Sequence, residues 1–295
     1  MISVATHSSK SGQRRRKAVN VIMLASTGLT TIIVIAPLIW ILGYVLQAGL
    51  PAINYSFFTQ LPTPVGVPGG GLANALVGSL ITVGLGALIA APIGVLAGIY
   101  AATNPNTPFG LFLRFGTDVI SGVPSIVMGI FAYTLVVLPQ RHFSALSAGI
   151  VLSFIMVPTI IRTTEEMIKL VPNSLREGSL ALGAAEWKTS ASIILPAALN
   201  GVLTGLMLAI ARAAGEAAPM LFTAFGNPFM NTDISQPIAT LPHTIFVYAI
   251  APYDDWHAKA WGTALVLIML TLLLNTLARL VVWWRVRRLG SVVRS

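Results

Sequence analysis

The sequence predicts an all-α, polytopic membrane protein with six transmembrane helices. Composition is the first indication, because 55% of the 295 residues are hydrophobic and only 9% are charged. Soluble domains carry about 25% charged residues, so a mean hydropathy of +0.82 points to a chain that lies in lipid. The second indication is arrangement, since the apolar residues gather into runs that reach the roughly 20 residues needed to cross a bilayer core.

These runs divide the chain into four parts. A basic cytoplasmic tail, 1–17, precedes the first transmembrane helix and its outer loop, 18–72. A core of five further helices covers 73–284 and contains a long polar insert at 166–197, and a second basic tail covers 285–295. The first run is too long for a cleaved signal peptide, so we expect it to be retained. The predicted spans are 18–47, 73–101, 115–138, 144–165, 198–225 and 259–284.

The positive charges set the expected orientation. The formal net charge is +9, and most Lys and Arg residues lie in the two tails or in loops on the same side as the tails. Only Arg141 and Lys259 fall in segments expected on the other side. Because cytoplasmic segments of membrane proteins carry the excess of Lys and Arg, we expect both termini in the cytoplasm. Topology therefore explains the charge, and we expect no nucleic acid among the partners.

Several kinds of chemistry lack the residues that they need. The chain has no Cys, which excludes disulfides and thiolate metal sites. The stretch from Gly183 to Lys188 and Thr189 imitates a nucleotide-binding loop but lacks its second Gly and follows no predicted strand. We therefore expect no cofactor, no metal and no enzymatic site, and a partner chain must bind any nucleotide. The four His residues are scattered without metal-ligand spacing: His7, His142, His243 and His257.

Small residues predict where the helices pack. Helices in lipid approach closely where small side chains recur at every fourth position. Such faces occur in the second and fifth spans, at Gly78, Thr82, Gly86, Ala90, Gly94 and Gly98, and at Gly201, Gly205, Ala209 and Ala213. Proline removes a backbone donor and kinks a helix, which we expect at Pro37, Pro92, Pro124, Pro158 and Pro219.

The polar insert has the features of a small folded unit. Ser174 and Glu177 have the spacing of a capping box, which predicts a short helix over about 175–182. Gly183 follows as its left-handed stop. A second short helix carries Trp187, and a turn at Pro196 leads into the next span. Such a capped helical pair exceeds what a connecting loop requires.

The insert also resembles a known motif. Glu177, Gly183, Ile193 and the pair Leu195-Pro196 match the EAA loop of ABC importer permeases, written E-A-A-x3-G-x9-I-x-L-P. Gly178 and Ser179 stand where that motif has two Ala residues. The resemblance implies that the first short helix is a coupling helix that docks in a groove of an ATP-hydrolysing subunit. The residues that it assigns to this contact are Ser174, Glu177, Gly178, Ser179, Leu182, Gly183 and Trp187.

Four further stretches narrow the resemblance. They are PSIVMGIFAY from Pro124, VPTIIRTTEEMIKL from Val157, AIARAAGEAAPMLFTA from Ala209 and QPIATLPHTIFVY from Gln236. Together they resemble phosphate-specific permeases of the PstA type, over roughly 14–284. The resemblance implies the type I ABC importer permease fold and a non-catalytic permease subunit of an ATP-driven phosphate importer in the bacterial inner membrane.

The same resemblance implies a set of partners. They are a second, homologous permease of the PstC type, two copies of an ATP-binding subunit of the PstB type, an extracytoplasmic phosphate-binding protein of the PstS type, and the lipid bilayer.

Charged residues within the spans are candidates for the substrate pathway. An Arg near the centre of a lone span costs at least about 2.5–3.5 kcal/mol, so it usually faces a bundle interior or a watery path. Arg212 and Glu216 lie four residues apart in the fifth span. Either Arg212 binds phosphate while Glu216 orients and offsets it, or the two form a structural ion pair. Arg162 either lines the inner half of the pathway, pairs with Glu166 or reaches toward the interface.

Other charges have simpler interpretations. Arg114 and Asp118, also four residues apart, are expected to pair at the start of the third span. Arg279 is expected to anchor the last span at the interface, beside Trp283 and Trp284.

Two other functions remain open at this point, an ABC permease for another oxyanion and a stand-alone secondary transporter. Secondary transporters often show inverted repeats and broken half-helices near mid-membrane, and the sequence shows neither by eye. Deleting 174–196 separates the classes, because only an ABC permease should lose both transport and its ATPase partner. An intramembrane enzyme lacks any nucleophile–base or metal constellation.

Overall fold

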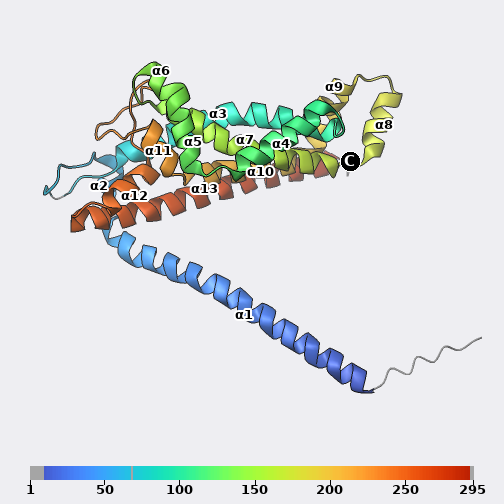
Figure 1. Ribbon diagram of the computed structural model, residues 1–295, viewed down its shortest axis with the longest axis horizontal. Coiled ribbons are helices and arrows are strands. Elements are labelled where there is room, and N and C mark those ends of the chain that lie inside the picture. The colour runs from blue at the N-terminus through green and yellow to red at the C-terminus, as the bar shows by residue number, and fades with distance from the viewer. Residues whose placement is uncertain (1–9, 68, 293–295) are drawn as a thin grey trace, which may run out of the picture.

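The computed structural model describes residues 10–67 and 69–292, and in this part of the chain every regular element is a helix. Four long helices run side by side: α3 (Ala73–Thr103), α7 (Ala145–Lys169), α10 (Leu195–Ala214) and α13 (Asp254–Val292) (Figure 1). We call one end of this bundle the α8 end, because it carries α8 (Asn173–Ala181) and α9 (Glu186–Thr189). The other is the α12 end, with α2 (Tyr55–Thr59), α11 (Ala218–Thr223) and α12 (Leu241–Ala249).

Five helices of the described residues are long and apolar enough to cross a membrane, and a bent pair brings the number to six. The bent pair is α4 (Pro108–Gly122) with α5 (Ser125–Ala132), which continues through a π-helical turn (Tyr133–Val137) into α6 (Leu138–Gln140). The all-α prediction is thereby confirmed. Several spans differ from the prediction in their ends or in their continuity.

The core lies in the seam between α3 and α7, as the small residues predict. The positions of Gly86, Gly94 and Gly98 leave no room for larger side chains. A Cβ atom at Gly94 would lie 2.7 Å from the Cβ of Ile160, and one at Gly98 would lie 2.6 Å from the Cβ of Thr164. Close backbone approach of this kind stabilises helix pairs in lipid, because the hydrophobic effect does not drive helices together there.

The small face of α10 packs on the same helix α7. Gly205 faces Thr163, and Gly201 faces Met167. Ala209 and Ala213 are each 1% exposed. Thus α7 has α3 on one side and α10 on another, which makes it the centre of the bundle.

The first helix, α1 (Lys10–Gly49), lies apart from the bundle over most of its length and contacts it at its last turns (Figure 1). Tyr44 meets Trp261 of α13 edge to face, with ring centroids 4.9 Å apart. A short 3-10 turn (Leu50–Ala52) then leads toward α2. The helix begins eight residues before the predicted start of the span, so the cations of Arg14 to Lys17 lie on its first turns. Residues 1–9 lie outside the described part.

The predicted span 115–138 is wrong as a single helix. The chain is extended at Val123 and Pro124, and the helices on either side of this elbow are bent by 105°. Proline disfavours the helical conformation of the preceding residue and removes an amide donor, so the two helices separate there.

The predicted span 198–225 is also wrong at both ends. Toward the α8 end the helix is longer, because α9, a π-helical turn (Ser190–Ile194) and α10 form one apolar segment over 29 residues. Pro196 therefore lies in the first turn of α10 and marks no turn of the chain. Toward the α12 end, α10 stops at Gly215, and α11 begins with Pro219 in its first turn. Glycine is a poor helix former and proline favours a helix start, which accounts for the break.

The last helix is longer than predicted. The backbone of α13 stays helical to Val292, beyond the predicted end of the span at 284. The side chains of Trp283 and Trp284 lie outside the described residues, as do the basic side chains of the tail 285–295.

Candidate functional site

The helical pair α8–α9 projects from one end of the bundle. Pro172 occupies the cap position before α8 in an extended conformation, and no side chain caps the helix. Ser174 is therefore the second helical residue, and the predicted capping box with Glu177 is wrong. The reason is that a cap must keep a non-helical backbone, and the chain already turns helical at Asn173.

The predicted stop at Gly183 is confirmed. Gly183 has φ +80°, the left-handed conformation that glycine adopts without a Cβ penalty. Its N–H donates to the Leu180 carbonyl at 2.9 Å, and the N–H of Ala184 donates to the Ser179 carbonyl at 3.2 Å. This pair of bonds is the Schellman arrangement, which satisfies the free carbonyls at the end of α8.

Two contacts hold α8 against α9. The hydroxyls of Ser179 and Thr189 lie 2.8 Å apart, and these two residues are 7% and 1% exposed. Arg176 pairs with Glu186 at 3.6 Å. The buried hydroxyl contact gives Ser179 a structural role at a position where the EAA motif has Ala.

The outer surface of this pair carries large apolar side chains. Leu182 is 90% exposed and Trp187 is 74% exposed. The other residues assigned to the coupling contact, Ser174, Glu177, Gly178 and Gly183, are also exposed, and Ser179 alone among them is buried. Exposed Trp and Leu residues beside a carboxylate form a surface suited to protein contact.

A second site lies at mid-length of the bundle, around Arg212. This residue is in the last turn of α10, and its guanidinium lies 4.0 Å from the carboxylate of Glu216. Because α10 has ended by then, the two are not on one helix face as predicted. The side chain of Arg212 is 61% exposed and that of Glu216 is 18% exposed.

Arg212 borders a small recess of 30 Å³ at the α4–α5 elbow. Its walls come from α4, α5 and α7, and include Ser121, Ser125 and Thr159. Thr159 lies near the middle of the 25-residue helix α7, so the recess is near mid-membrane. Sequence reasoning did not single out Ser125 or Thr159, although the nearby Pro124 was a signal of irregular backbone at this depth.

Arg162 does not pair with Glu166 along its own helix. It reaches across to α4, where its guanidinium lies 2.5 Å from the carboxylate of Asp118. Both side chains are more than half exposed, at 58% and 57%. They border a cavity of 330 Å³ toward the α8 end.

The predicted pair between Arg114 and Asp118 is wrong. The Nη2 of Arg114 lies 2.6 Å from the carboxylate of Glu165 on α7, to which its Nε also donates. Nη2 also donates to the carbonyl of Ala101, and Nη1 donates to that of Pro105. Lys169 binds the same carboxylate of Glu165 at 2.5 Å. Since α4 packs against α7, the two charged residues of α4 pair with charges on α7. Spacing along one helix therefore did not identify the partner.

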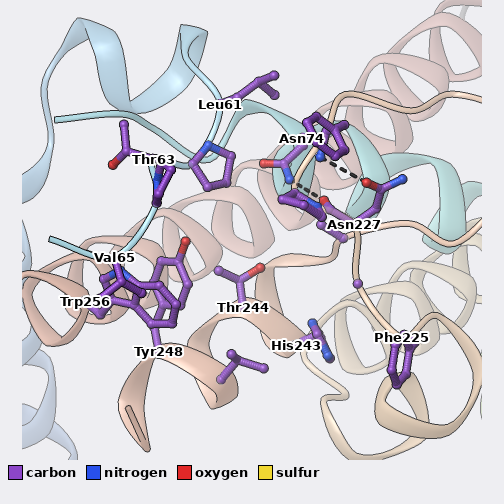
Figure 2. Close-up of a pocket in the computed structure, with 17 residues that line it drawn as sticks. Leu61, Thr63, Val65, Asn74, Phe225, Asn227, His243, Thr244, Tyr248 and Trp256 are labelled. Atoms are coloured by element: carbon purple, nitrogen blue, oxygen red, sulfur yellow. Dashed lines mark hydrogen bonds between the residues drawn. The ribbon is translucent and has the colours of Figure 1, made fainter. Parts of the chain in front are cut away.

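A larger cavity, of 710 Å³, lies at the α12 end (Figure 2). It is bordered by the segment from Leu61 to Val65, the segment from Phe225 to Phe229, α12 and Trp256. None of its lining residues is Lys, Arg, Asp or Glu. Burial lowers the pKa of His243, so its ring is neutral near pH 7. The cavity therefore offers no cation to an anionic ligand.

Asn74 is a buried polar residue in the wall of this cavity. It is 3% exposed, and its amide donates to the Asn227 carbonyl at 2.6 Å, while its Oδ1 has no hydrogen-bond partner in the described residues (Figure 2). Sequence reasoning did not single out this residue, since a lone Asn before an apolar run carries no recognisable pattern.

The described residues contain no group of three or more His, Asp and Glu side chains that could hold a metal ion. The charged clusters contain ion pairs between helices, such as Arg114–Glu165, and ion pairs one turn apart on the same helix, such as Lys169–Glu165. The candidate sites among the predicted residues are the exposed surface of α8–α9 and Arg212 at mid-length of the bundle.

Comparison with known proteins decides the family. The model of the binding-protein-dependent transport system inner membrane component matches residues 94–290, a region that contains α8–α9, Arg162 and Arg212. This chain belongs to that family. The chain is accordingly a multi-pass component of an inner membrane.

Curated relatives extend the likeness over most of the chain. The phosphate transport system permease protein PstA of Yersinia pestis is 43% identical over 273 residues, which is 92% of each chain. That of Haemophilus influenzae is 42% identical and covers 90% of this chain and 94% of its own. PstA 1 of Mycobacterium tuberculosis is 32% identical over 93% of this chain. The predicted resemblance to this permease family is confirmed.

Solved structures bear on the fold alone. A chain of the MetNI methionine ABC transporter in an inward facing conformation superposes with a TM-score of 0.57 at 18% identity, covering 72% of this chain and 93% of that one. A second crystal form of the same transporter gives 0.55 at 19% identity, with the same coverage. The type I ABC importer permease fold is thereby confirmed.

Proposed function

We propose that this chain is the permease subunit of an ATP-driven inorganic phosphate importer, in which it forms half of the translocation pathway. The assignment of phosphate as the substrate rests on the 43% identity to a phosphate transport permease over 92% of both chains. The matched length leaves no large segment unaccounted for, and both candidate sites lie within it.

Coupling to ATP hydrolysis is assigned to α8–α9. In this proposal the α8 end and both termini face the cytoplasm, in agreement with the distribution of Lys and Arg. The exposed surface of Ser174, Glu177, Gly178, Leu182, Gly183 and Trp187 contacts a cytoplasmic ATP-binding subunit, and Ser179 stabilises the helical pair from inside. The chain itself performs no catalysis.

The continuous helix from α9 into α10 suits this role. It links the docking surface to Arg212 without a loop between them. A movement of α8–α9 on closure of an ATPase dimer therefore reaches mid-membrane as motion of a rigid element.

The pathway residues are Arg212, Glu216 and Arg162. The Arg212 guanidinium presents paired N–H donors that match the oxygens of phosphate. Glu216, at 4.0 Å, offsets this charge so that the anion is released after binding. Arg162 lies closer to the α8 end, where phosphate competes with Asp118 for its guanidinium on the way to the cytoplasm.

The proposed assembly contains four kinds of chain. A second, homologous permease supplies the other half of the pathway, two copies of the ATP-binding subunit dock on the cytoplasmic side, and an extracytoplasmic phosphate-binding protein delivers the substrate at the α12 end. The exposure of Arg212 in the single chain agrees with a pathway that is completed by the second permease.

One observation reopens the secondary transporter as an alternative. The spans at 115–138 and 198–225 are broken in the structure. Broken helices near mid-membrane are common in secondary transporters, so the sequence-based argument from their absence is wrong. The projecting helical pair α8–α9 still favours the ABC permease, because a stand-alone carrier has no use for a docking surface.

Transport in proteoliposomes tests the proposal. The purified complex should take up radiolabelled phosphate only with ATP and the phosphate-binding protein, and excess sulfate or molybdate should not compete. Deleting 174–196 should abolish both uptake and retention of the ATPase. Uptake by this chain alone, driven by an ion gradient, would instead establish the secondary transporter, and competition by sulfate or molybdate would establish another oxyanion as the substrate.

A further inference from the structure

Two backbone irregularities meet beside Arg212. The elbow between α4 and α5 and the end of α10 both border the same recess, and α7 contributes the turn around Pro158. Helix breaks at membrane depth persist where they are buried in protein or line a watery cavity, because lipid cannot satisfy the free backbone groups. The recess is therefore a place where polar residues from four helices converge, α4, α5, α7 and α10.

The cation in this recess lacks a strong partner in the described residues. It forms an ion pair with Glu216 at 4.0 Å, a distance beyond that of a hydrogen bond. By contrast, Arg114 and Arg162 each have a carboxylate within 2.6 Å. Among these three guanidinium groups, that of Arg212 is the one available to an external anion.

Two hydroxyls face the same recess without an intramolecular role. Ser125 and Thr159 line it, and within the described residues neither hydroxyl has a hydrogen-bond partner. Both residues are half-buried. Most other Ser and Thr side chains on these helices donate back to a carbonyl one turn earlier, as Ser121 does to Thr117 and Thr163 does to Thr159. Ser125 and Thr159 keep their donors free.

We propose that Ser125 and Thr159 are phosphate-binding residues that complete, with Arg212, the part of the mid-membrane site contributed by this chain. The inference rests on the proposed function and deepens it. The guanidinium of Arg212 binds two oxygens of the anion, and the hydroxyls from α5 and α7 bind the remaining oxygens. The side chain of Arg212 is 61% exposed, so this chain supplies one wall of the site and the second permease supplies the other.

The hydroxyls add a property that Arg212 lacks. A guanidinium only donates, whereas a hydroxyl donates or accepts. At neutral pH phosphate carries both bare and protonated oxygens, so a hydroxyl can satisfy either kind. Hydrogen bonds to a charged group contribute about 1.5–3 kcal/mol, which corresponds to a loss of roughly 10-fold to 100-fold in affinity when one is removed.

Equilibrium binding of radiolabelled inorganic phosphate to the purified permease–ATPase complex, without the phosphate-binding protein, tests this inference. Ser125→Ala and Thr159→Val should each weaken binding at least about 10-fold, and Arg212→Gln should remove it. Thr159→Ser keeps the hydroxyl and should restore most of the affinity. Thr204→Val is the matched control, because that exposed hydroxyl on α10 bonds to the Asn200 carbonyl outside the recess.

The outcomes separate the two levels of the account. If Arg212→Gln loses phosphate while Ser125→Ala and Thr159→Val bind as tightly as the wild type, the two hydroxyls are not ligands and the inference fails alone. If the wild-type complex binds no phosphate and takes none up with the binding protein present, the proposed function fails with it. Equal losses in Thr204→Val and Thr159→Val would also overturn the inference, since they would reflect general damage to the helices.

Discussion

The seam between α3 and α7 and the region around the α4–α5 elbow use opposite designs. In the seam two unbroken helices meet through small residues, and a Cβ atom at Gly86, Gly94 or Gly98 would lie within 3 Å of a side-chain atom of α7. At the elbow helices end, change direction by 105° and leave Arg212 and two hydroxyls without strong partners. The close-packed seam is rigid, and the broken region carries the polar groups.

The two regions give one bundle two properties, transmission of motion and polar groups at mid-membrane. Close packing transmits motion, because well-packed helices move as a unit and do not deform gradually. Broken helices supply backbone and side-chain donors at a depth where a continuous helix would satisfy all of its own groups. The two regions share α7, so a movement of the rigid pair changes the geometry of the recess.

The largest effect is expected from filling the seam. Gly94→Leu should prevent α3 from approaching α7, since even its Cβ would lie 2.7 Å from Ile160. Overpacking of this kind costs about 1–3 kcal/mol or more, and we expect little folded protein by size-exclusion chromatography in detergent. Gly84→Leu is the control, because nothing lies within 4 Å of its Cβ position on the same helix. Equal yields of the two variants would show that the seam is not close-packed.

Removing the mid-membrane cation should abolish function while the fold persists. Arg212→Gln should assemble with its partners in normal amounts but show no phosphate uptake in proteoliposomes, because the anion loses its charged ligand. Arg279→Gln removes an exposed Arg of α13 and should transport normally. Normal uptake by Arg212→Gln would exclude Arg212 from the pathway.

A smaller effect is expected at the end of α8. Gly183→Ala places a Cβ on a residue with φ +80° and should destabilise the helical pair by about 1 kcal/mol. Gly178→Ala, within α8 and with open space around it, should instead stabilise the helix by up to about 1 kcal/mol. Hydrogen exchange of the α8 amides measures both, and we expect about 5-fold changes in opposite directions. Changes of the same sign would contradict the assigned end of the helix.

The smallest effect concerns the contact inside the pair. Ser179→Ala leaves the buried hydroxyl of Thr189 without its partner at 2.8 Å, at a cost of about 1 kcal/mol. The double variant Ser179→Ala with Thr189→Val removes both polar groups and should recover part of this stability. Hydrogen exchange across 173–189 measures the difference. A double variant less stable than the single one would argue against the hydroxyl bond as the main contact.

The regular parts of this fold could be predicted because their signals are local and repeated. Small residues at every fourth position identified the face of α3 that lies in the seam. The left-handed helix end at Gly183 followed from its position after a short helical pattern. Each such signal lies within the residues of a single helix, so it can be read from the sequence.

The irregular parts depend on how helices meet, and the sequence does not display that. Proline residues 37, 92 and 158 lie inside helices that continue, whereas Pro124 and Pro219 adjoin breaks, yet all five look alike in an apolar run. The difference between the predicted and the observed ion-pair partners has the same origin. Arg114 and Asp118 have ideal helical spacing, and only the packing of α4 on α7 gives them Glu165 and Arg162 instead.

The central claim is that α8 is the surface through which an ATPase drives this bundle, and affinity purification in mild detergent tests it most directly. Wild-type protein should bring along the ATP-binding subunit and the second permease. Glu177→Lys reverses an exposed charge on α8 and should lose the ATP-binding subunit while it retains the second permease. Unchanged amounts of ATP-binding subunit with Glu177→Lys would contradict the claim.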